Sequence, residues 1–163
     1  GSGRRIDFKN TLIILTSNVG TDLIMGLSRD PHYRSDPEAM MEALRPELLK
    51  VFPPALLGRI VTVPYYPLSD EVLGGIVRLH LDRIGARIRV NHDAAFVYDD
   101  ATVEHIVSLC NDPGSGGRMI DNIITNTLLP ALSREFLTRS LARDELKEAR
   151  VTVADGGFAY AWG

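Results

Sequence analysis

The sequence contains a single cysteine and no long apolar run. Because Cys110 stands alone, no disulfide can form within the 163-residue chain, a cysteine usage typical of a reducing compartment. A membrane-spanning helix needs about 18 or more consecutive apolar residues, and no stretch approaches that length. We therefore expect a cytoplasmic protein without membrane contact.

The sequence also has no excess of basic residues. The chain has 18 Lys and Arg against 21 Asp and Glu, giving a formal net charge of −3. Proteins dedicated to nucleic acid use a basic excess to displace counterions, so we expect no nucleic-acid partner. Hydrophobic residues make up 45% and charged residues 24%, the balance of a globular protein.

The usual signatures of a self-sufficient enzyme are absent. A phosphate-binding loop needs Gly-Lys followed by Ser or Thr, yet Lys9, Lys50 and Lys147 all follow residues other than glycine. No apolar strand ends in Asp-Glu, and the histidines and Cys110 show no metal-ligand spacing. We expect this polypeptide alone to hold no metal and to hydrolyse nothing.

The first third of the chain predicts strands and short helices. Thr11 to Thr16 is a continuous β-rich apolar run, typical of a strand buried on both faces of a parallel sheet. Proline-rich and polar stretches interrupt the chain after this run. The expected elements are a helix at 19–25, a loop at 28–37, a helix at 38–44, a second helical turn from Pro46 to 51, and a strand at 60–63.

The remainder predicts amphipathic helices and a hairpin. Ser69 suits an N-cap, and the helix after it carries apolar residues at helical spacing. A later helix repeats its apolar residues every fourth position, with Pro130 expected to bend or interrupt it. The elements are the stripe Leu73, Val77, Leu81, Ile84 and Ile88; a strand at 96–98; a helix capped by Asp99 or Asp100; a break at 112–117; the repeat Ile120, Ile124, Leu128, Leu132 and Phe136; and a hairpin joining 151–153 to 158–160 through 155–157.

This order predicts a mixed α/β chain whose first strand has too few partners. One buried strand and one edge-like strand cannot form a doubly wound sheet, so we expect a section of sheet upstream of this sequence. Gly1-Ser2 is interpreted as a cloning remnant. We place a boundary between residues 66 and 67, in the proline-flanked stretch around Pro64 and Pro67.

Asn18 ends the first predicted strand, where α/β sheets place ligands. Its amide can donate to a phosphate oxygen and orient a water. The alternative is that Asn18 simply caps the next helix along the chain.

Arg59 follows an apolar turn and precedes the second predicted strand. An arginine held there can be presented at a subunit surface, and such an arginine acting on a neighbour's phosphate accelerates transfer by about 10³ to 10⁵. The alternative is an ordinary surface salt bridge, worth under about 1 kcal/mol.

Gly116, Gly117 and Arg118 open the long helix. Glycines allow close approach of the backbone to a ligand, and the planar guanidinium suits phosphate. The alternative is a flexible helix start with a solvated arginine.

Taken together, these stretches resemble the second ATPase module of Clp-type AAA+ unfoldases. The resemblance is carried by GRRIDFKNTLIILTSNVG at residues 3–20, FPPALLGRI at 52–60 and GGR at 116–118. VPYYPLSD at 63–70, RMIDNI at 118–123 and LLPALS at 128–133 are most similar to the ClpV branch, the ATPases of type VI secretion. The resemblance to the Clp-type family extends over nearly the whole chain after Gly1-Ser2.

The resemblance implies a fold and three residue roles. Residues 3–66 would be the C-terminal end of an AAA+ large α/β subdomain, and residues 67–163 an α+β small lid subdomain with a short sheet. Asn18 would be the first sensor of the γ-phosphate. Arg59 would be the arginine finger, acting in trans, and Arg118, with Gly117, would be the second sensor at the nucleotide.

It also implies a parent protein with activities that this sequence does not carry alone. The parent would be a bacterial cytoplasmic homohexamer that uses ATP and Mg²⁺ to unfold protein. Its substrate would be the type VI sheath subunits, which it would bind through regions upstream of this sequence. No nucleotide is expected on this piece by itself. Two alternatives remain open: a ClpB-like general disaggregase, and a non-enzymatic module that binds partner proteins.

Overall fold

A computed structural model describes residues 7–110 and 116–163. The expected cloning remnant, residues 3–6 of the first family-like stretch and most of the expected break at 112–117 lie outside the described residues. The chain divides into two compact units, Gly1–Tyr65 and Tyr66–Gly163. We call them the N-terminal unit and the C-terminal unit.

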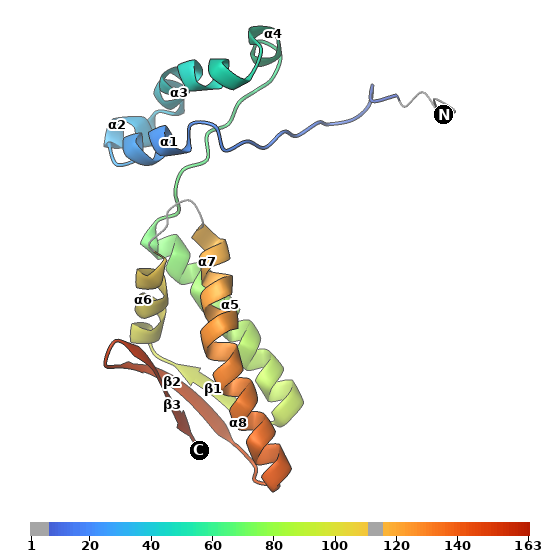
Figure 1. Ribbon diagram of the computed structural model, residues 1–163, viewed down its shortest axis with the longest axis vertical. Helices are drawn as coiled ribbons and strands as arrows, with labels where there is room; N and C mark the ends of the chain where they lie inside the picture. The colour runs from blue at the N-terminus through green and yellow to red at the C-terminus, as the bar shows by residue number, and fades with distance from the viewer. Residues whose placement is uncertain (1–6, 111–115) are drawn as a thin grey trace. The chain divides into compact units, whose positions relative to one another are not determined.

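The N-terminal unit is built from four helices, α1 (Thr21–Leu27), α2 (Pro31–Ser35), α3 (Pro37–Val51) and α4 (Pro54–Leu57) (Figure 1). The Asp36 carboxylate caps α3, accepting hydrogen bonds from the backbone N–H groups of Glu38 at 2.9 Å and Ala39 at 3.1 Å. One face of α3 buries Met40, Leu44 and Leu48. These three residues are the only apolar side chains fully buried among the described residues of this unit.

Two helix predictions in this unit were wrong. The expected loop at 28–37 contains α2, because Asp30 accepts from His32 N–H at 2.9 Å and Pro31 fits the first helical turn. The expected pair of helices at 38–51 is one continuous helix through Pro46. Pro46 is exposed, so water can satisfy the carbonyl that loses its backbone donor.

Both strands predicted in this unit are also absent. Residues 11–16 and 60–63 are irregular, and Leu12, Ile14 and Val61 are 88%, 77% and 92% exposed. A strand is stabilised by hydrogen bonds to a neighbouring strand. The described residues of the N-terminal unit offer no such neighbour, so apolar β-branched sequence alone does not produce a strand here.

The C-terminal unit begins with α5 (Asp70–His92), capped as predicted by the Ser69 hydroxyl, which accepts from Val72 N–H at 3.3 Å. All five residues of the predicted apolar stripe are buried. Of the two predicted candidates, Asp99 caps α6 (Asp100–Leu109), and Asp100 is its first residue. The Tyr98 hydroxyl donates to Asp82 Oδ1 of α5 at 2.7 Å, and partial burial together with this bond raises the pKa of Tyr98 to about 12.

The long helix has three parts: α7 (Gly116–Ile123), a π-helical turn (Ile124–Leu128) and α8 (Leu129–Ala142). The predicted interruption near Pro130 is confirmed. The regular α-helical winding gives way to the π-helical turn, which ends at Leu128, and Pro130 then lies in the first turn of α8. The predicted apolar face of this helix, with one apolar residue at every fourth position, is confirmed as well. Its members are all buried: Ile120, Ile124, Leu128, Leu132 and Phe136.

A three-stranded sheet completes this unit, formed by β1 (Ala95–Tyr98), β2 (Glu148–Ala154) and β3 (Gly157–Trp162) in the order β1-β2-β3. The predicted hairpin is confirmed: β2 and β3 are antiparallel and turn through Asp155 and Gly156, whose φ values are 51° and 75°. The parallel pairing of β1 with β2 was not predicted. The mixed fold class, mostly helical with a short sheet, is confirmed.

Thr102 is the one fully buried polar side chain among the described residues. Its hydroxyl donates to Asp99 Oδ1 at 2.6 Å and lies 3.3 Å from the Val151 carbonyl oxygen. Thr102 therefore lies where the helix cap of α6 meets β2.

Candidate functional site

Asn18 lies in the turn before α1, with its side chain exposed. Its carbonyl oxygen accepts from Thr21 Oγ1 at 2.7 Å and from Thr21 N–H at 3.3 Å, whereas α1 has no side-chain cap. The capping alternative is therefore not what this side chain does. Within the described residues its amide makes no hydrogen bond, so both amide donors and the oxygen are available.

Gly20 explains how this turn is held. It adopts a φ of 78°, and a Cβ there would lie 2.5 Å from Leu44 Cδ2 of α3. A side chain would therefore be strained in conformation and would also clash with a buried leucine. The turn that carries Asn18 is packed directly on the small core of the N-terminal unit.

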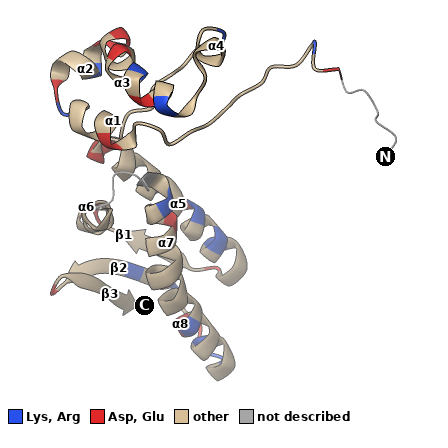
Figure 2. Ribbon diagram, turned by 45° about the horizontal axis from the view of Figure 1, so that its top comes forward, with Lys and Arg blue, Asp and Glu red and all other residues tan. Residues whose placement is uncertain are grey.

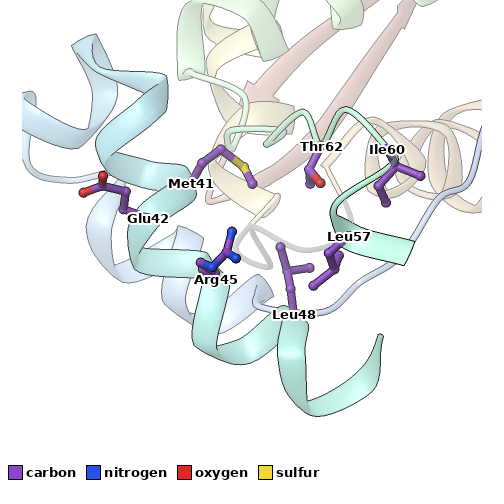
Figure 3. A pocket seen from close by; sticks show the side chains of 7 residues that line it. All are labelled: Met41, Glu42, Arg45, Leu48, Leu57, Ile60 and Thr62. Carbon is purple, nitrogen blue, oxygen red and sulfur yellow. The ribbon is translucent and has the colours of Figure 1, made fainter. Parts of the chain in front are cut away.

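Arg59 sits in the turn that follows α4, and the neighbouring segment lines a hollow together with α3. Figure 3 shows Leu57, Ile60 and Thr62 facing α3 residues across a shallow hollow of about 250 Å³. The α3 side of the hollow is lined by Met41, Glu42, Arg45 and Leu48. The turn itself is held locally, since the Gly58 N–H donates to the Pro54 carbonyl oxygen at 3.0 Å.

The Arg59 side chain is exposed and forms no ion pair within the described part of the chain. Its backbone N–H donates to the Leu56 carbonyl at 2.9 Å, which closes the turn. The salt-bridge alternative therefore finds no support here. An exposed guanidinium on an anchored turn is the arrangement that contact with an anion outside the unit requires.

Arg118 is exposed in the first turn of α7 and likewise has no carboxylate partner among the described residues. A Cβ added at Gly117 would meet nothing within 4 Å, so this glycine leaves open space beside the helix start. Backbone N–H groups in the first turn of a helix favour anions. The position suits a phosphate, although the glycine is not needed for packing.

The four predicted site residues fall in both units. Asn18 and Arg59 belong to the N-terminal unit, whereas Gly117 and Arg118 belong to the C-terminal unit. Their convergence on one triphosphate pocket therefore stays a prediction, as do their individual roles.

The donor set fits phosphate better than metal. The Asn18 amide and the Arg59 and Arg118 guanidinium groups, which have no side-chain partner in the part of the chain that the structure describes, can all donate to phosphate oxygens. Among residues 7–110 and 116–163, no group of three or more His, Cys, Asp or Glu side chains is placed to hold a metal ion. Figure 2 shows further arginines along α5, and one of them, Arg78, is paired with Asp100 at 2.9 Å.

One arrangement near Arg118 was missed from the sequence. Asp121, one helical turn after Arg118, lies with its Oδ1 3.8 Å from His80 Nδ1 of α5. The spacing of Arg118 and Asp121 is visible in the sequence, but the arrival of His80 from a helix about 40 residues earlier is not. Only the packing of α5 against α7 brings these side chains together.

Comparison with known families covers nearly all of the chain. Residues 68–151 match the C-terminal, D2-small domain of ClpB protein, and residues 1–63 match the AAA domain of the Cdc48 subfamily. The chain belongs to the Clp-type AAA+ family. No helix within the described ranges is long and apolar enough to cross a membrane.

Curated relatives place it within that family. The chain is 55% identical to the AAA+ ATPase ClpV1 of Pseudomonas aeruginosa over 98% of its own length, and 46% identical to the chaperone protein ClpB of Yersinia enterocolitica over 84%. A ClpB of Bdellovibrio bacteriovorus is 31% identical over 85%. The chain spans only 18%, 15% and 15% of these relatives, respectively. Of these three, it is most similar to ClpV1.

Proposed function

We propose that this chain is the C-terminal part of the second AAA+ module of a ring-forming protein unfoldase driven by ATP hydrolysis. The parent would be a homohexamer of the bacterial cytoplasm that binds ATP and Mg²⁺ between subunits. The observation that carries the proposal is the pair of exposed guanidinium groups, Arg59 and Arg118, which have no internal ion pair in the described residues of a Clp-type chain. Unpaired arginines on anchored turns and helix starts suit contact with phosphate.

Each residue then has a distinct task. Arg59 donates to nucleotide held by the neighbouring subunit and stabilises the charge that develops during phosphoryl transfer. Arg118, beside Gly117, binds phosphate of its own subunit's nucleotide and links nucleotide state to the position of the lid. Asn18 orients the attacking water through its free amide.

The proposed substrate is the sheath of a type VI secretion system, which the motor would take apart. The greater identity to ClpV1 than to ClpB supports this choice. A ClpB-like disaggregase is the second candidate, supported by the match to the ClpB D2-small domain. Assays of the full-length protein on contracted sheath and on aggregated protein separate the two.

The decisive experiment is Arg59→Ala in the full-length hexamer. Because the proposed finger acts only on charge in the transition state, we expect turnover to fall by about 10³ to 10⁵ while ATP affinity is kept. Arg29→Ala removes another exposed arginine of the same unit and serves as the control, expected to leave turnover unchanged. Loss of ATP binding with hexamers intact would contradict the finger role.

The chain alone is expected to show no ATPase activity and at best very weak ATP affinity. Calorimetry of the 163-residue chain with ATP measures this directly. Tight binding would mean that the chain holds a complete nucleotide site of a kind the family resemblance does not imply.

A further inference from the structure

Arg118 has a potential partner on its own helix that it does not use. Asp121 follows Arg118 by three residues on α7, the spacing at which oppositely charged side chains on a helix lie side by side and attract. Both side chains are exposed, so nothing in the burial of either one prevents a pair. Yet the described residues contain no Arg118–Asp121 ion pair; the Asp121 carboxylate lies instead beside His80.

His80 is well placed to compete for this carboxylate. It projects from α5, and its side chain is only 28% exposed, against 66% for Asp121. The 3.8 Å separation of Nδ1 and Oδ1 is too long for a hydrogen bond, so the attraction is that of an ion pair and requires a protonated imidazole. A partly buried ring has fewer alternative rotamers than an exposed arginine, so it gives up less entropy when it holds the carboxylate.

We infer that His80 is a positioning residue for Arg118: it draws the Asp121 carboxylate toward α5 and so leaves the Arg118 guanidinium unpaired for phosphate. This inference rests on the proposed role of Arg118 as the second sensor. The inference gives His80 and Asp121 opposite effects on nucleotide affinity. His80 keeps the Asp121 carboxylate away from Arg118, whereas Asp121 would neutralise the charge of Arg118 by pairing with it.

The opposite signs make the inference testable by a double-mutant cycle. In the full-length protein, His80→Ala should release Asp121 to pair with Arg118 and raise the Kd for ATPγS about two-fold, the size expected for an exposed pair one helical turn apart. Asp121→Asn should keep the affinity at or above the original. His80→Ala combined with Asp121→Asn should restore it, because no carboxylate is left to compete.

A purely structural pair predicts a different pattern. If His80 and Asp121 only held α7 against α5, each single change would weaken binding and the double variant would bind no better than either. That result would overturn the inference.

A second measurement on the 163-residue chain separates this inference from the proposed function. Hydrogen exchange of the Arg118 Nε–H, followed by ¹⁵N NMR, should slow in His80→Ala and return to its original rate in the double variant. Unchanged exchange in His80→Ala overturns the inference whatever the ATPγS result. If exchange responds as expected while Arg118→Ala leaves the Kd unaltered, the sensor role of Arg118 is overturned instead.

Discussion

The two units of this chain differ in how much apolar surface each can bury by itself. Among the described residues, the C-terminal unit has a continuous core of sixteen buried residues drawn from its helices and its sheet. The described part of the N-terminal unit buries three apolar residues, all from α3, while Leu12, Val61 and Tyr65 remain 88%, 92% and 86% exposed. Apolar surface removed from water contributes roughly 25 cal/mol per Å², so the two units gain very different stabilisation from folding.

This contrast shows where each unit's structure comes from. In the C-terminal unit, caps, apolar stripes and the hairpin all agree with one packed arrangement. In the N-terminal unit α2 and α3 are capped by aspartate side chains, whereas α1 and α4 have no side-chain cap and the strand-like segments lack partners among the described residues. Contiguous apolar segments at 11–16 and 60–63 are thus left exposed among the described residues of this unit.

Separating the units is the strongest test of this comparison. Residues 66–163 alone should unfold in a single cooperative transition in urea, because their core is self-contained. Residues 1–65 alone should show no cooperative transition, since three buried side chains cannot offset the chain entropy. Circular dichroism across a urea titration measures both, and a cooperative transition of the shorter piece would break the comparison.

A matched pair of Leu→Ala substitutions compares a buried leucine of the C-terminal unit with an exposed leucine of the N-terminal unit. Leu81 of α5 is fully buried, so Leu81→Ala should lower the free energy of unfolding of the C-terminal unit by about 2 to 5 kcal/mol. Leu12→Ala removes the same atoms from an 88% exposed side chain and should change stability by less than about 0.5 kcal/mol. Equal effects in urea unfolding would mean that Leu12 is buried in solution.

The buried hydroxyl of Thr102 is the next test. Thr102→Val keeps the shape but removes the hydroxyl that donates to Asp99 and lies 3.3 Å from the Val151 carbonyl oxygen, so we expect a loss of about 1 to 3 kcal/mol. Thr138→Val removes an exposed hydroxyl that bonds only within α8, to the Arg134 carbonyl, and should have little effect. Thermal unfolding of the two variants, compared with the original chain, measures the contrast.

The smallest expected effect is a pH dependence at Asp99. Its hydrogen bonds from Thr102 hold the pKa of this carboxyl below its ordinary value of 3.8. Since the folded pKa is the lower one, the stabilisation is present above 3.8 and is lost as the pH falls through the folded pKa. The urea midpoints of the original chain and of Asp99→Asn should therefore come closer together as the pH is lowered. A difference between them that grows on acidification would contradict the lowered pKa of Asp99.

Local signals in the sequence predicted much of the C-terminal unit. Ser69 caps the helix that it was expected to cap, Asp99 is one of the two residues expected to cap α6, and the apolar stripes of α5 and of the long helix are buried residue for residue. Pro130 marked the place where the long helix changes its winding. Each of these depends on residues within one or two helical turns, which is why sequence spacing was sufficient.

The candidate site was predictable only in part. The exposure of Asn18, Arg59 and Arg118 agrees with the chemistry expected of them, but the hollow that residues 57–62 share with α3 became visible only in the packed structure. The approach of His80 to Asp121 could not be read from the sequence, because it depends on the way α5 and α7 pack. Neither helix alone contains that information.

By itself, then, the sequence determined the family, the helix caps, the buried stripes and the β2–β3 hairpin, since hydrogen bonds in helices and tight turns join residues close in the chain. Tertiary structure alone decided that β1 pairs in parallel with β2, that α3 continues through Pro46, and that the segments at 11–16 and 60–63 form no strands. A strand exists only where a distant segment supplies the other half of its hydrogen bonds, and no spacing of apolar residues can provide that.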